Sequence, residues 1–367
     1  MPEPVDIFGH LKAANGCVIA ETACGHDGDL EKLTQLIDSV AESGTKLIKF
    51  QLFYLEERAL ESEEEWHIFG RLLLQDEQWE KAVGYARSRQ LGVITDVYGE
   101  RSLMLAKRLG VDGFKVHSED LLNSYFIARV AEEGQLLLIS VGGAHRKELS
   151  TLLSFLQKKD LLNQVVLMAG VQTFPTPLES HSLEEISDLI RRYSHYGVKV
   201  GISDHVAGDL EEAHIFPLMA LARGACIIEK HVTIDRADEW TDFQSALDKV
   251  EFKRFVQSVQ KLSPLLDPVG PMNEDEKKYR QMFKKSPSFI ADLPKGHVLK
   301  DTDIEFVKDT QRAIPISSLS LEGKALSQDV KKGELCKISR FENSVGGIIV
   351  ARCTSDRLPN KALRKIQ

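Results

Sequence analysis

The sequence contains no long apolar run. Across its 367 residues, no stretch approaches the roughly 18 consecutive apolar residues of a membrane-spanning helix. Its first residues, MPEPVDIFGHLKAANG, also lack the charged and then apolar pattern of a secretion signal. We therefore expect a soluble, cytoplasmic protein with no membrane partner.

The sequence also lacks paired cysteines and an excess of positive charge. Its five cysteines are an odd number, scattered and without a CxxC pair, which is typical of reduced thiols. The formal net charge of -8 argues against a nucleic-acid partner, because binding a phosphate backbone needs a basic face. A small anionic substrate is still compatible with this charge, since a few local lysines can bind it.

What the sequence does contain is a regular alternation of short apolar strands and helix-length amphipathic segments. Strands are predicted at residues 17–22, 47–53, 92–98, 113–118, 136–141, 164–170, 199–205 and 226–232. Helices are predicted at residues 30–43, 63–74, 77–90, 100–109, 121–132, 145–156, 182–196, 209–222 and 249–262. Eight strand-helix repeats at this spacing favour a closed (β/α)8 TIM barrel over an open doubly wound sheet.

The composition changes after Leu262, and we expect four segments. A barrel domain would span residues 1–262, followed by a linker at 263–282 that is rich in proline and charge and has about one helical turn. Residues 283–342 read as a small β-rich domain, with β-type pieces SFIADL, VKDT, ALSQDV and LCKISRF and two similar halves. It contains no catalytic constellation, so we expect it to cover a barrel mouth, its own or that of a partner subunit. The fourth segment is a tail at 343–367.

Two histidines stand at the ends of neighbouring predicted strands. The stretch from Val200 to Thr233 reads as strand, helix, strand, with His205 and His231 at the two strand ends. Parallel strands open on the same face, so the two imidazoles would meet there. Neutral imidazoles suit divalent manganese, iron, cobalt or zinc, and two protein ligands leave room for water or substrate, as a catalytic metal needs. An isolated histidine would more often only hydrogen-bond at its strand end, but two of them one repeat apart favour the metal.

Other polar side chains stand at or just after the predicted strand ends. They are Glu21, Lys49, Gln51, Thr95, Asp96, Lys115, Ser118, Ser140, Gln172 and Ser203. Lys49 and Lys115 lie inside apolar runs, where an uncompensated ammonium is costly to bury. Either lysine could instead snorkel or pair with Glu21, and the serines could cap helices. Their joint position beside two histidines makes a phosphate or carboxylate pocket the better interpretation.

Eight motifs occur in order along the chain. They are IAETACGHDGD (19–29), LIKFQ (47–51), GFKVHSED (113–120), LLISVGG (137–143), FPTP (174–177), GISDH (201–205), IIEKH (227–231) and TDFQSAL (241–247). This series resembles the successive motifs of the sialic acid synthase family, and the C-terminal segment is similar to that family's antifreeze-like SAF domain. The resemblance implies a condensation of phosphoenolpyruvate with an N-acetylmannosamine-type amino sugar, giving a nine-carbon 2-keto acid for surface polysaccharide. It also implies a domain-swapped homodimer in which each SAF domain covers the partner's barrel.

The resemblance assigns roles to the residues that match it. His205 and His231 would bind Mn²⁺, with Mg²⁺ or Co²⁺ as alternatives, and the metal would polarise the sugar aldehyde. Glu21 would lie near the metal and the attacked carbon, where a carboxylate can orient water or stabilise positive charge. The residues expected to bind phosphoenolpyruvate are Lys49, Thr95, Lys115, Ser118, Ser140 and Ser203. The residues expected on the sugar side are Gln51, Asp120, Gln172, Phe174, Asp242 and Lys285.

Three departures from the family pattern lie on the sugar side. Gly25 stands where the family usually has asparagine, and Gln172 and Phe174 replace a short polar residue and a tyrosine. The C-terminal domain begins KKSPS, so Lys284 or Lys285 replaces an arginine without its planar fork. Two alternatives therefore stay open: another carboligase or aldolase that uses phosphoenolpyruvate or a keto acid, and a non-catalytic sugar-acid-binding homologue.

The tail carries a separate resemblance. ARCTSDRLPNK (351–361) is similar to the opening nucleotide loop of cytidylyltransferases that activate such acids and of related spore-coat polysaccharide proteins. A basic loop of this kind can hold a triphosphate. We expect the natural chain to continue into a nucleotidyltransferase domain, the alternative being a simple basic tail.

Overall fold

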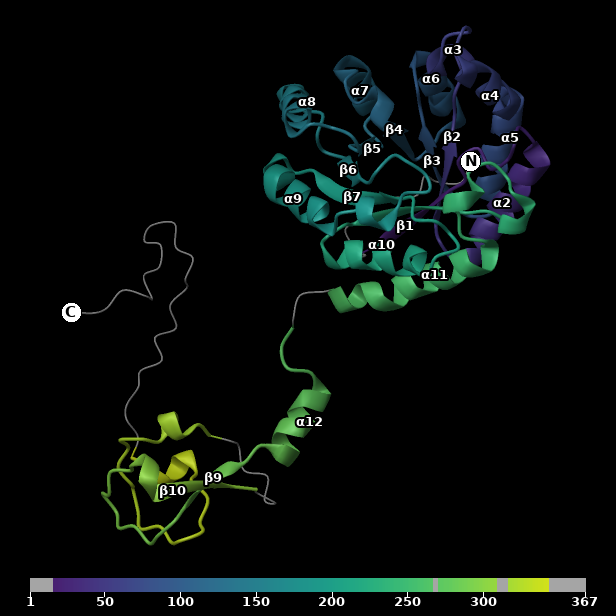
Figure 1. The fold of residues 1–367 in the computed structure, drawn as a ribbon. Helices are drawn as coiled ribbons and strands as arrows, with labels where there is room; N and C mark the ends of the chain where they lie inside the picture. Colours follow the sequence, from purple (N-terminus) through teal and green to yellow (C-terminus); the bar gives the residue numbers. More distant parts are fainter. Residues whose placement is uncertain (1–15, 267–269, 309–315, 343–367) are drawn as a thin grey trace. The chain divides into compact units, whose positions relative to one another are not determined.

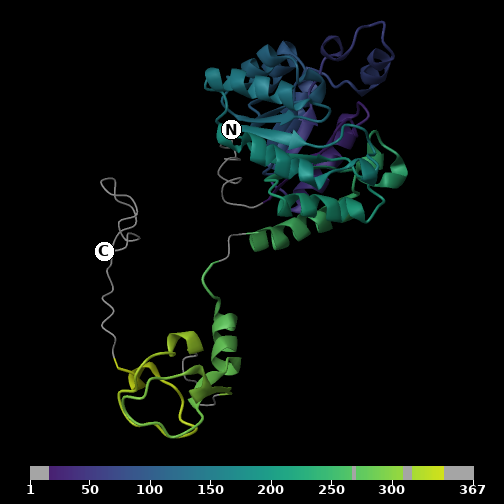
Figure 2. The same ribbon diagram turned by 60° about the vertical axis from the view of Figure 1, so that its left-hand side comes forward.

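The computed structural model describes residues 16–266, 270–308 and 316–342. The chain forms two compact units, Met1–Asp267 and Pro268–Gln367. Figures 1 and 2 show the first unit as a barrel ringed by helices and the second as a small unit with short strands. Among the described residues, no helix has the length and apolar character needed to cross a membrane.

The first unit is a closed barrel of eight strands that follow one another in chain order. The strands are β1 (Cys17–Glu21), β2 (Leu47–Gln51), β3 (Gly92–Asp96), β4 (Gly113–Val116), β5 (Leu136–Ser140), β6 (Val165–Ala169), β7 (Lys199–Asp204) and β8 (Ile227–His231). All neighbours are parallel, and β1 pairs with both β2 and β8, which closes the sheet. The predicted (β/α)8 barrel is confirmed.

Helices surround the barrel on its outside (Figure 1). They are α2 (Leu30–Ser43), α3 (Leu55–Arg58), α4 (Glu64–Leu72), α5 (Asp76–Ser88), α6 (Glu100–Leu109), α7 (Ser124–Ala131), α8 (Arg146–Lys158), α9 (Leu183–Tyr193), α10 (Glu212–Ala222) and α11 (Lys249–Leu262). Side chains at the N-caps explain some of the starts: Asp29 accepts a hydrogen bond at the start of α2 and Asp248 at the start of α11. Each helix predicted around the barrel has a counterpart at its place.

Two apolar layers decide which strand residues can reach the barrel interior. Successive residues of a strand point to opposite faces. On β3, Val93 packs in the layer between barrel and helices, whereas Ile94 packs in the layer inside the barrel. The inner layer consists of Ile19, Leu47, Ile94, Leu136, Leu138, Val166, Met168 and Ile227. A residue two positions further along a strand therefore faces the same interior, nearer the carboxyl end.

The second unit contains α12 (Glu274–Phe283) and an antiparallel pair, β9 (Ser286–Phe289) and β10 (Ile304–Val307). Isolated bridges such as Leu293 to Val330 join the remaining loops around a small core. The linker prediction of one helical turn is wrong, because α12 has ten residues and begins with a reciprocal cap between Asn273 and Glu276. Its assignment as an SAF domain stays a prediction, and the tail at 343–367 lies outside the described residues.

Candidate active site

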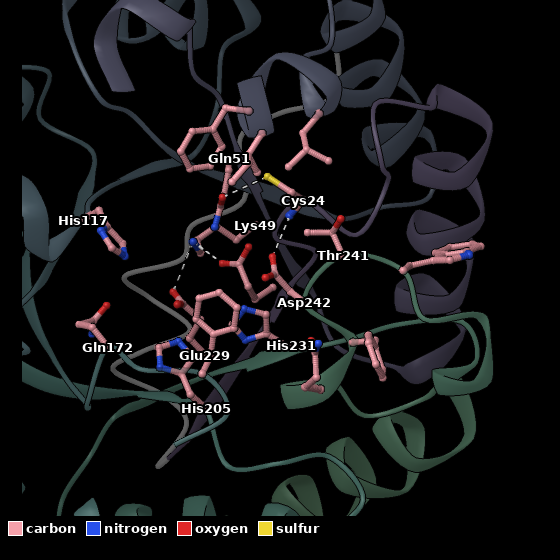
Figure 3. Close-up of a pocket in the computed structure, with 18 of the residues that line it drawn as sticks. Cys24, Lys49, Gln51, His117, Gln172, His205, Glu229, His231, Thr241 and Asp242 are labelled. Atoms are coloured by element: carbon pink, nitrogen blue, oxygen red, sulfur yellow. Dashed lines mark hydrogen bonds and ion pairs between the residues drawn. The ribbon is translucent and has the colours of Figure 1, made fainter. Parts of the chain in front are cut away.

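A cavity of about 500 Å³ opens at the carboxyl end of the barrel (Figure 3). Glu21, Gln51 and His231 end their strands there, and His205 directly follows β7. Loops and the insertion between β2 and α5 complete the wall. The lining residues include Glu21, Cys24, Lys49, Gln51, Arg58, Phe69, Tyr98, Lys115, His117, Gln172, Phe174, His205, Glu229, His231, Trp240 and Asp242. A barrel of this kind carries its chemistry at this end.

The cavity brings together nine of the residues singled out from the sequence. They are Glu21, Lys49, Gln51, Lys115, Gln172, Phe174, His205, His231 and Asp242. The two lysines and the two histidines therefore line one cavity, although they lie far apart in the sequence. The same arrangement gives the cavity both cationic groups and potential metal ligands.

Both lysines are already paired with carboxylates. Lys49 is fully buried and contacts Glu21 and Asp96, with Glu229 at 3.8 Å from its ammonium nitrogen. Lys115 contacts Glu229. Burial alone would lower the pKa of Lys49, but Asp96 and Glu21 outweigh it and hold that pKa well above its usual value. The pairing of Lys49 with Glu21, an alternative left open by the sequence, is thus present in the structure.

Two of the three acids beside the lysines, Glu21 and Glu229, differ in protonation. Burial raises the pKa of Glu21 to about 8, although Lys49 opposes this shift. Burial also acts on Glu229, but Lys115 and Lys49 outweigh it and lower the pKa of Glu229 to about 2. At neutral pH, Glu229 is therefore ionised and Glu21 mostly holds a proton. Two buried acids with separated pKa values are a feature of sites that move protons.

The two histidines are in the form that binds metals. Their ring centroids lie 5.3 Å apart, and burial lowers the pKa of both, so both imidazoles are neutral at pH 7. The Nδ1 of His205 donates to the carbonyl of Val171 at 2.7 Å, which leaves Nε2 with a free lone pair. The Nδ1 of His231 is buried without a hydrogen-bond partner among the described residues.

These two rings fit a divalent metal as part of an open site. Within residues 16–266 and the described parts of the second unit, no group of three or more His, Cys, Asp or Glu side chains is placed to hold a metal ion. The protein would thus supply two nitrogen ligands, and water or substrate would supply the rest. Catalytic metals keep such exchangeable positions, whereas structural zinc sites are closed by four protein ligands.

Thr95 is a wrong choice for this cavity. It is in register with Phe50 and Phe114, which pack in the layer between barrel and helices, so its side chain faces away from the interior. Its neighbour Asp96 has the inward position and contacts Lys49. The sequence placed both residues at the end of the same strand, and a shift of one position exchanges the two faces.

Ser140 and Ser203 are buried at strand ends and have hydroxyl groups without a partner among the described residues. Each faces the interior, because Ser140 lies two residues after Leu138 of the inner layer and Ser203 lies two residues before His205. A buried hydroxyl without a partner is costly, so a polar ligand that contacts it would stabilise the site.

Ser140 and Ser203 are not among the residues that line the cavity, and neither are three further predicted contacts, Ser118, Asp120 and Lys285. Ser118 and Asp120 belong to a short 3-10 helix after β4 and are half-buried. Lys285 is an exposed residue of the second unit, and its role on the sugar side stays a prediction. The structure thus supports the histidine and lysine positions more directly than these three.

The sequence reading missed Glu229, Arg58 and His117. Glu229 could have been found, because it lies between Ile227 and His231 with the same inward alternation. Arg58 ends α3, contacts Glu119 and lies over the rings of Tyr98 and Phe69 at 4.0 and 4.2 Å. Burial lowers the pKa of His117 to about 4. No local pattern distinguishes these last two from surface residues.

Comparison with known proteins gives relatives along most of the chain. Pseudaminic acid synthase of Campylobacter jejuni is 26% identical over 345 residues, which is 89% of this chain and 96% of the relative. N,N'-diacetyllegionaminic acid synthase of the same species is 25% identical, covering 87% of this chain and 98% of the relative. The resemblance seen in the motifs is therefore confirmed at the level of whole sequences.

Solved structures agree with this relationship. N-acetylneuraminic acid (sialic acid) synthetase from Leptospira borgpetersenii superposes with a TM-score of 0.65 at 27% identity, covering 72% of this chain and 91% of that one. A putative spore coat polysaccharide biosynthesis protein E from Chromobacterium violaceum gives a TM-score of 0.75 at 21% identity, covering 89% and 99%, and supports the fold alone. The NeuB family model matches residues 36–268, more than half of the sequence, and the chain belongs to the NeuB family.

Proposed function

We propose that the protein condenses phosphoenolpyruvate with an N-acetylmannosamine-type amino sugar to form a nine-carbon 2-keto sugar acid for surface polysaccharide. The observation that carries this proposal is one cavity lined by two neutral imidazoles and two buried ammonium groups. Relatives named as pseudaminic and legionaminic acid synthases cover most of the chain and support the same reaction type.

Phosphoenolpyruvate carries a phosphate and a carboxylate, and the cavity offers matching groups. Lys49 and Lys115 would bind its negative charges at the inner end of the cavity. The hydroxyls of Ser140 and Ser203, which have no partner among the described residues, would donate to its oxygens. Because these groups are buried, water is excluded and each polar contact is stronger than it would be at the surface.

His205 and His231 would hold a divalent cation, with Mn²⁺ proposed first and Mg²⁺ or Co²⁺ as alternatives. When bound, the cation would polarise the sugar aldehyde as a Lewis acid. The hydrogen bond from His205 to Val171 fixes the ring so that Nε2 is the available nitrogen. Burial keeps both rings neutral, which preserves their lone pairs in neutral solution.

Glu21 is proposed as the group that exchanges a proton. A carboxyl group with a pKa of about 8 can accept or release a proton near neutral pH. When C3 of phosphoenolpyruvate adds to the sugar aldehyde, its double-bond electrons form the new C–C bond and leave positive charge at C2. The ionised form of Glu21 would then take a proton from the water that adds at C2, after which the C2–O bond breaks, phosphate leaves and the 2-keto group forms. The anchoring of Glu21 is rigid, because its Oε1 accepts a hydrogen bond from the backbone of Ala23 at 2.6 Å.

The acceptor sugar would occupy the outer part of the cavity, beside Gln51, Gln172, Phe174 and Asp242. Burial raises the pKa of Asp242, and its Oδ2 accepts a long hydrogen bond of 3.4 Å from the backbone of Cys24. Asp120 and Lys285 are kept as proposed sugar contacts. A homodimer in which the C-terminal unit covers the partner's barrel also belongs to this proposal.

The test is an assay of phosphate release with phosphoenolpyruvate, Mn²⁺ and a panel of 2-acetamido and 2,4-diacetamido hexoses. We expect release only when a sugar and a metal are both present, with a product whose mass equals that of a nine-carbon keto acid. Product from pyruvate in place of phosphoenolpyruvate would indicate an aldolase. Tight binding of the sugar acid without phosphate release would indicate a non-catalytic homologue.

A single substitution tests the proposed metal ligands. His231→Ala should reduce turnover to the background level, because one of only two protein ligands is lost. Its thermal stability should change little, since the ring lies at the barrel mouth. The measurement is turnover together with Mn²⁺ binding by calorimetry, and a fully active variant would contradict the assignment.

A further inference from the structure

Asp96 is a buried carboxylate in contact with Lys49, which lines the cavity, and the proposed reaction gives Asp96 no role. It ends β3 and is in register with Gln51 of β2 and Lys115 of β4. One of its oxygens contacts the ammonium of Lys49. The other, Oδ1, is buried and has no hydrogen-bond partner among the described residues. This carboxylate thus has one strong contact, and that contact is to a proposed donor-binding group.

Five ionisable side chains, Lys49 among them, form one group of contacts. Lys49 lies against Glu21 and Asp96, with Glu229 at 3.8 Å, and Lys115 lies against Glu229. Three carboxyl groups therefore face two ammonium groups. An anion that enters finds both ammonium groups already paired, so it has to compete with a carboxylate of the protein.

Asp96 is the carboxylate whose removal would disturb the fewest other contacts. Glu21 also accepts a hydrogen bond from the backbone of Ala23. Glu229 contacts Lys115 directly and lies near Lys49 as well. Among the described residues, the side chain of Asp96 makes its one ion pair with Lys49 and no other hydrogen bond.

We propose that Asp96 is a specificity-determining residue that weakens the binding of multiply charged anions, phosphate esters above all, at Lys49. It does so by holding the Lys49 ammonium and by repelling a phosphate or carboxylate group brought to the same nitrogen. Solvent screens like charges in a buried site much less than charges at the surface, so a ligand anion beside Asp96 is repelled more strongly there. The identity of the donor rests on the proposed function, whereas the repulsion does not.

The test is the binding of inorganic phosphate and of phosphoenolpyruvate, measured by calorimetry without added metal. Asp96→Asn keeps the size of the side chain and removes its charge, and we expect it to bind both anions at least about tenfold more tightly. Asp96→Ser is the second variant, because it frees Lys49 without placing an amide there. Folding of each variant is checked by circular dichroism and thermal unfolding.

Asp112→Asn is the matched control. Asp112 is also buried and pairs with Arg87 at 3.3 Å, but it accepts a hydrogen bond from the backbone of Val93, near the start of β3. Its variant should bind phosphate as the natural protein does. Folded Asp96→Asn and Asp96→Ser proteins that bind phosphate no more tightly than the natural protein would overturn the inference.

Binding and turnover separate this inference from the proposed function. If neither the natural protein nor Asp96→Asn releases phosphate with any sugar, while the variant binds phosphate more tightly, the proposed function fails and the role of Asp96 stands. If the natural protein turns over and the variants bind no more tightly, the role of Asp96 fails and the proposed function stands.

Discussion

Lys49 and Lys115 show how a charged residue can be placed inside a barrel. An unpaired ammonium in an apolar interior would be strongly unfavourable, and each lysine is therefore in contact with a carboxylate. The pairs are coupled, because Glu229 lies near both lysines. Removing one member changes the environment of the others, so single substitutions here affect stability as well as binding.

Lys115→Met should show both effects. It leaves Glu229 as a buried carboxylate that has lost its direct partner, which costs about 3 kcal/mol or more of unfolding free energy. It should also weaken phosphoenolpyruvate binding, since one of two cationic contacts is lost. The measurements are urea unfolding and calorimetric titration with phosphoenolpyruvate.

The double variant Lys115→Met, Glu229→Gln separates the two effects. Neutralising Glu229 removes the unpaired charge, so most of the lost stability should return. Binding of phosphoenolpyruvate should stay weak, because no ammonium has been restored. Recovery of binding together with stability would mean that Lys115 has only a structural role.

A buried ion pair joins the strands β7 and β8 next to the two histidines. Asp204 and Lys230 precede His205 and His231, and strand alternation turns them to the opposite face. Their side chains are 0% exposed and pair at 2.7 Å. Asp204 also accepts a hydrogen bond from the backbone of Val206 at 3.0 Å, and Lys230 donates to the carbonyl of Val206 at 3.4 Å. The pair fixes the strand ends that carry the proposed metal ligands.

Asp204→Asn should therefore destabilise the barrel by about 3 to 5 kcal/mol, because it leaves Lys230 buried and unpaired. It should also weaken Mn²⁺ binding by at least about tenfold, since the strand ends lose their common anchor. Urea unfolding and calorimetric titration with Mn²⁺ measure the two effects. A loss of stability without any change in Mn²⁺ affinity would restrict the pair to a structural role.

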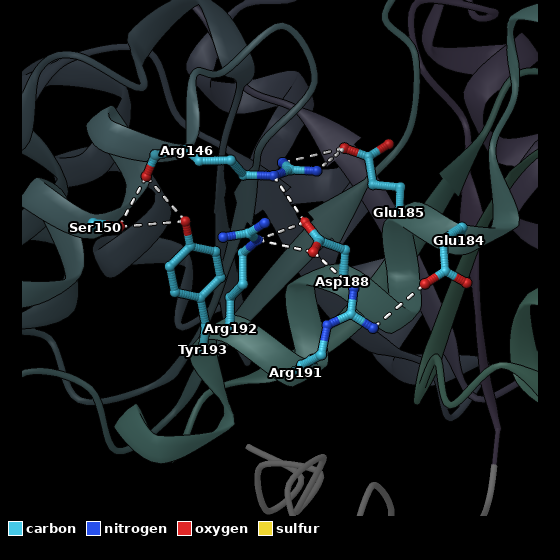
Figure 4. A network of polar contacts seen from close by, with 8 residues as sticks. All are labelled: Arg146, Ser150, Glu184, Glu185, Asp188, Arg191, Arg192 and Tyr193. Carbon is cyan, nitrogen blue, oxygen red and sulfur yellow. Dashed lines mark hydrogen bonds and ion pairs between the residues drawn. The ribbon is translucent and has the colours of Figure 1, made fainter.

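A surface network supplies the comparison for this variant (Figure 4). Asp188 of α9 accepts hydrogen bonds from Arg191 and Arg192 of its own helix and from Arg146 of α8. These arginines are between 36% and 62% exposed, so solvent screens their pairing. Asp188→Asn should cost about 1 kcal/mol and leave Mn²⁺ binding unchanged.

The periods of single strands and helices explain which parts of the fold the sequence could predict. Strand and helix periods are local, so the order of the eight strands and the surrounding helices could be read without a structure. The side of a strand on which a residue lies depends on an exact register, and one position separates Thr95 from Asp96. The length of α12 was not predictable from composition, because the Asn273 and Glu276 that cap the helix lie in a stretch as charged as a linker.

Site residues were predictable where a charged or metal-binding side chain stands at the end of a predicted strand, and less predictable elsewhere. The histidines and lysines were found because they stand at the ends of apolar runs. Glu229 lies in the motif IIEKH (227–231). Its contact with Lys115 joins strands on different sides of the barrel, so a local pattern does not show it. Arg58 acquires its role from aromatic rings on other segments, and such a contact exists only after folding.

Across the barrel, six histidines with a lowered pKa couple stability to pH: His26, His117, His181, His205, His214 and His231. Burial lowers the pKa of His26 and His117 to about 4 and also lowers the pKa of His205 and His231. In the unfolded chain a histidine has a pKa near 6.5. Below that pH the unfolded state binds protons that the folded state does not, so the free energy of unfolding falls as the pH is lowered.

Glu21 acts in the opposite direction but does not reverse the sign. With its pKa raised to about 8, the folded protein holds a proton that the unfolded chain releases down to a pH near 4.5. Its contribution to stability therefore increases as the pH falls from 8 to 4.5. Burial also raises the pKa of Glu119, Asp120 and Asp242, but a carboxyl group ordinarily titrates near pH 4, whereas the histidines titrate in the unfolded chain near 6.5. The histidines with a lowered pKa outnumber Glu21 in that range, so acidification below pH 6.5 should destabilise the barrel on balance.

Between pH 6.5 and 5.5 we expect the unfolding free energy of the metal-free protein to fall, because the unfolded chain takes up protons on histidines whose pKa is lowered by folding. Urea unfolding followed by tryptophan fluorescence reports this for the barrel alone, because Trp66, Trp79 and Trp240 all lie in the first unit. His26→Gln should reduce the pH dependence by about one proton. His195→Gln, at an exposed position after α9, should leave it unchanged. If the unfolding free energy stays constant over this range, the prediction is contradicted. The buried rings would then accept protons in the folded protein, and the neutral imidazoles that the proposed metal site needs would not persist in mild acid.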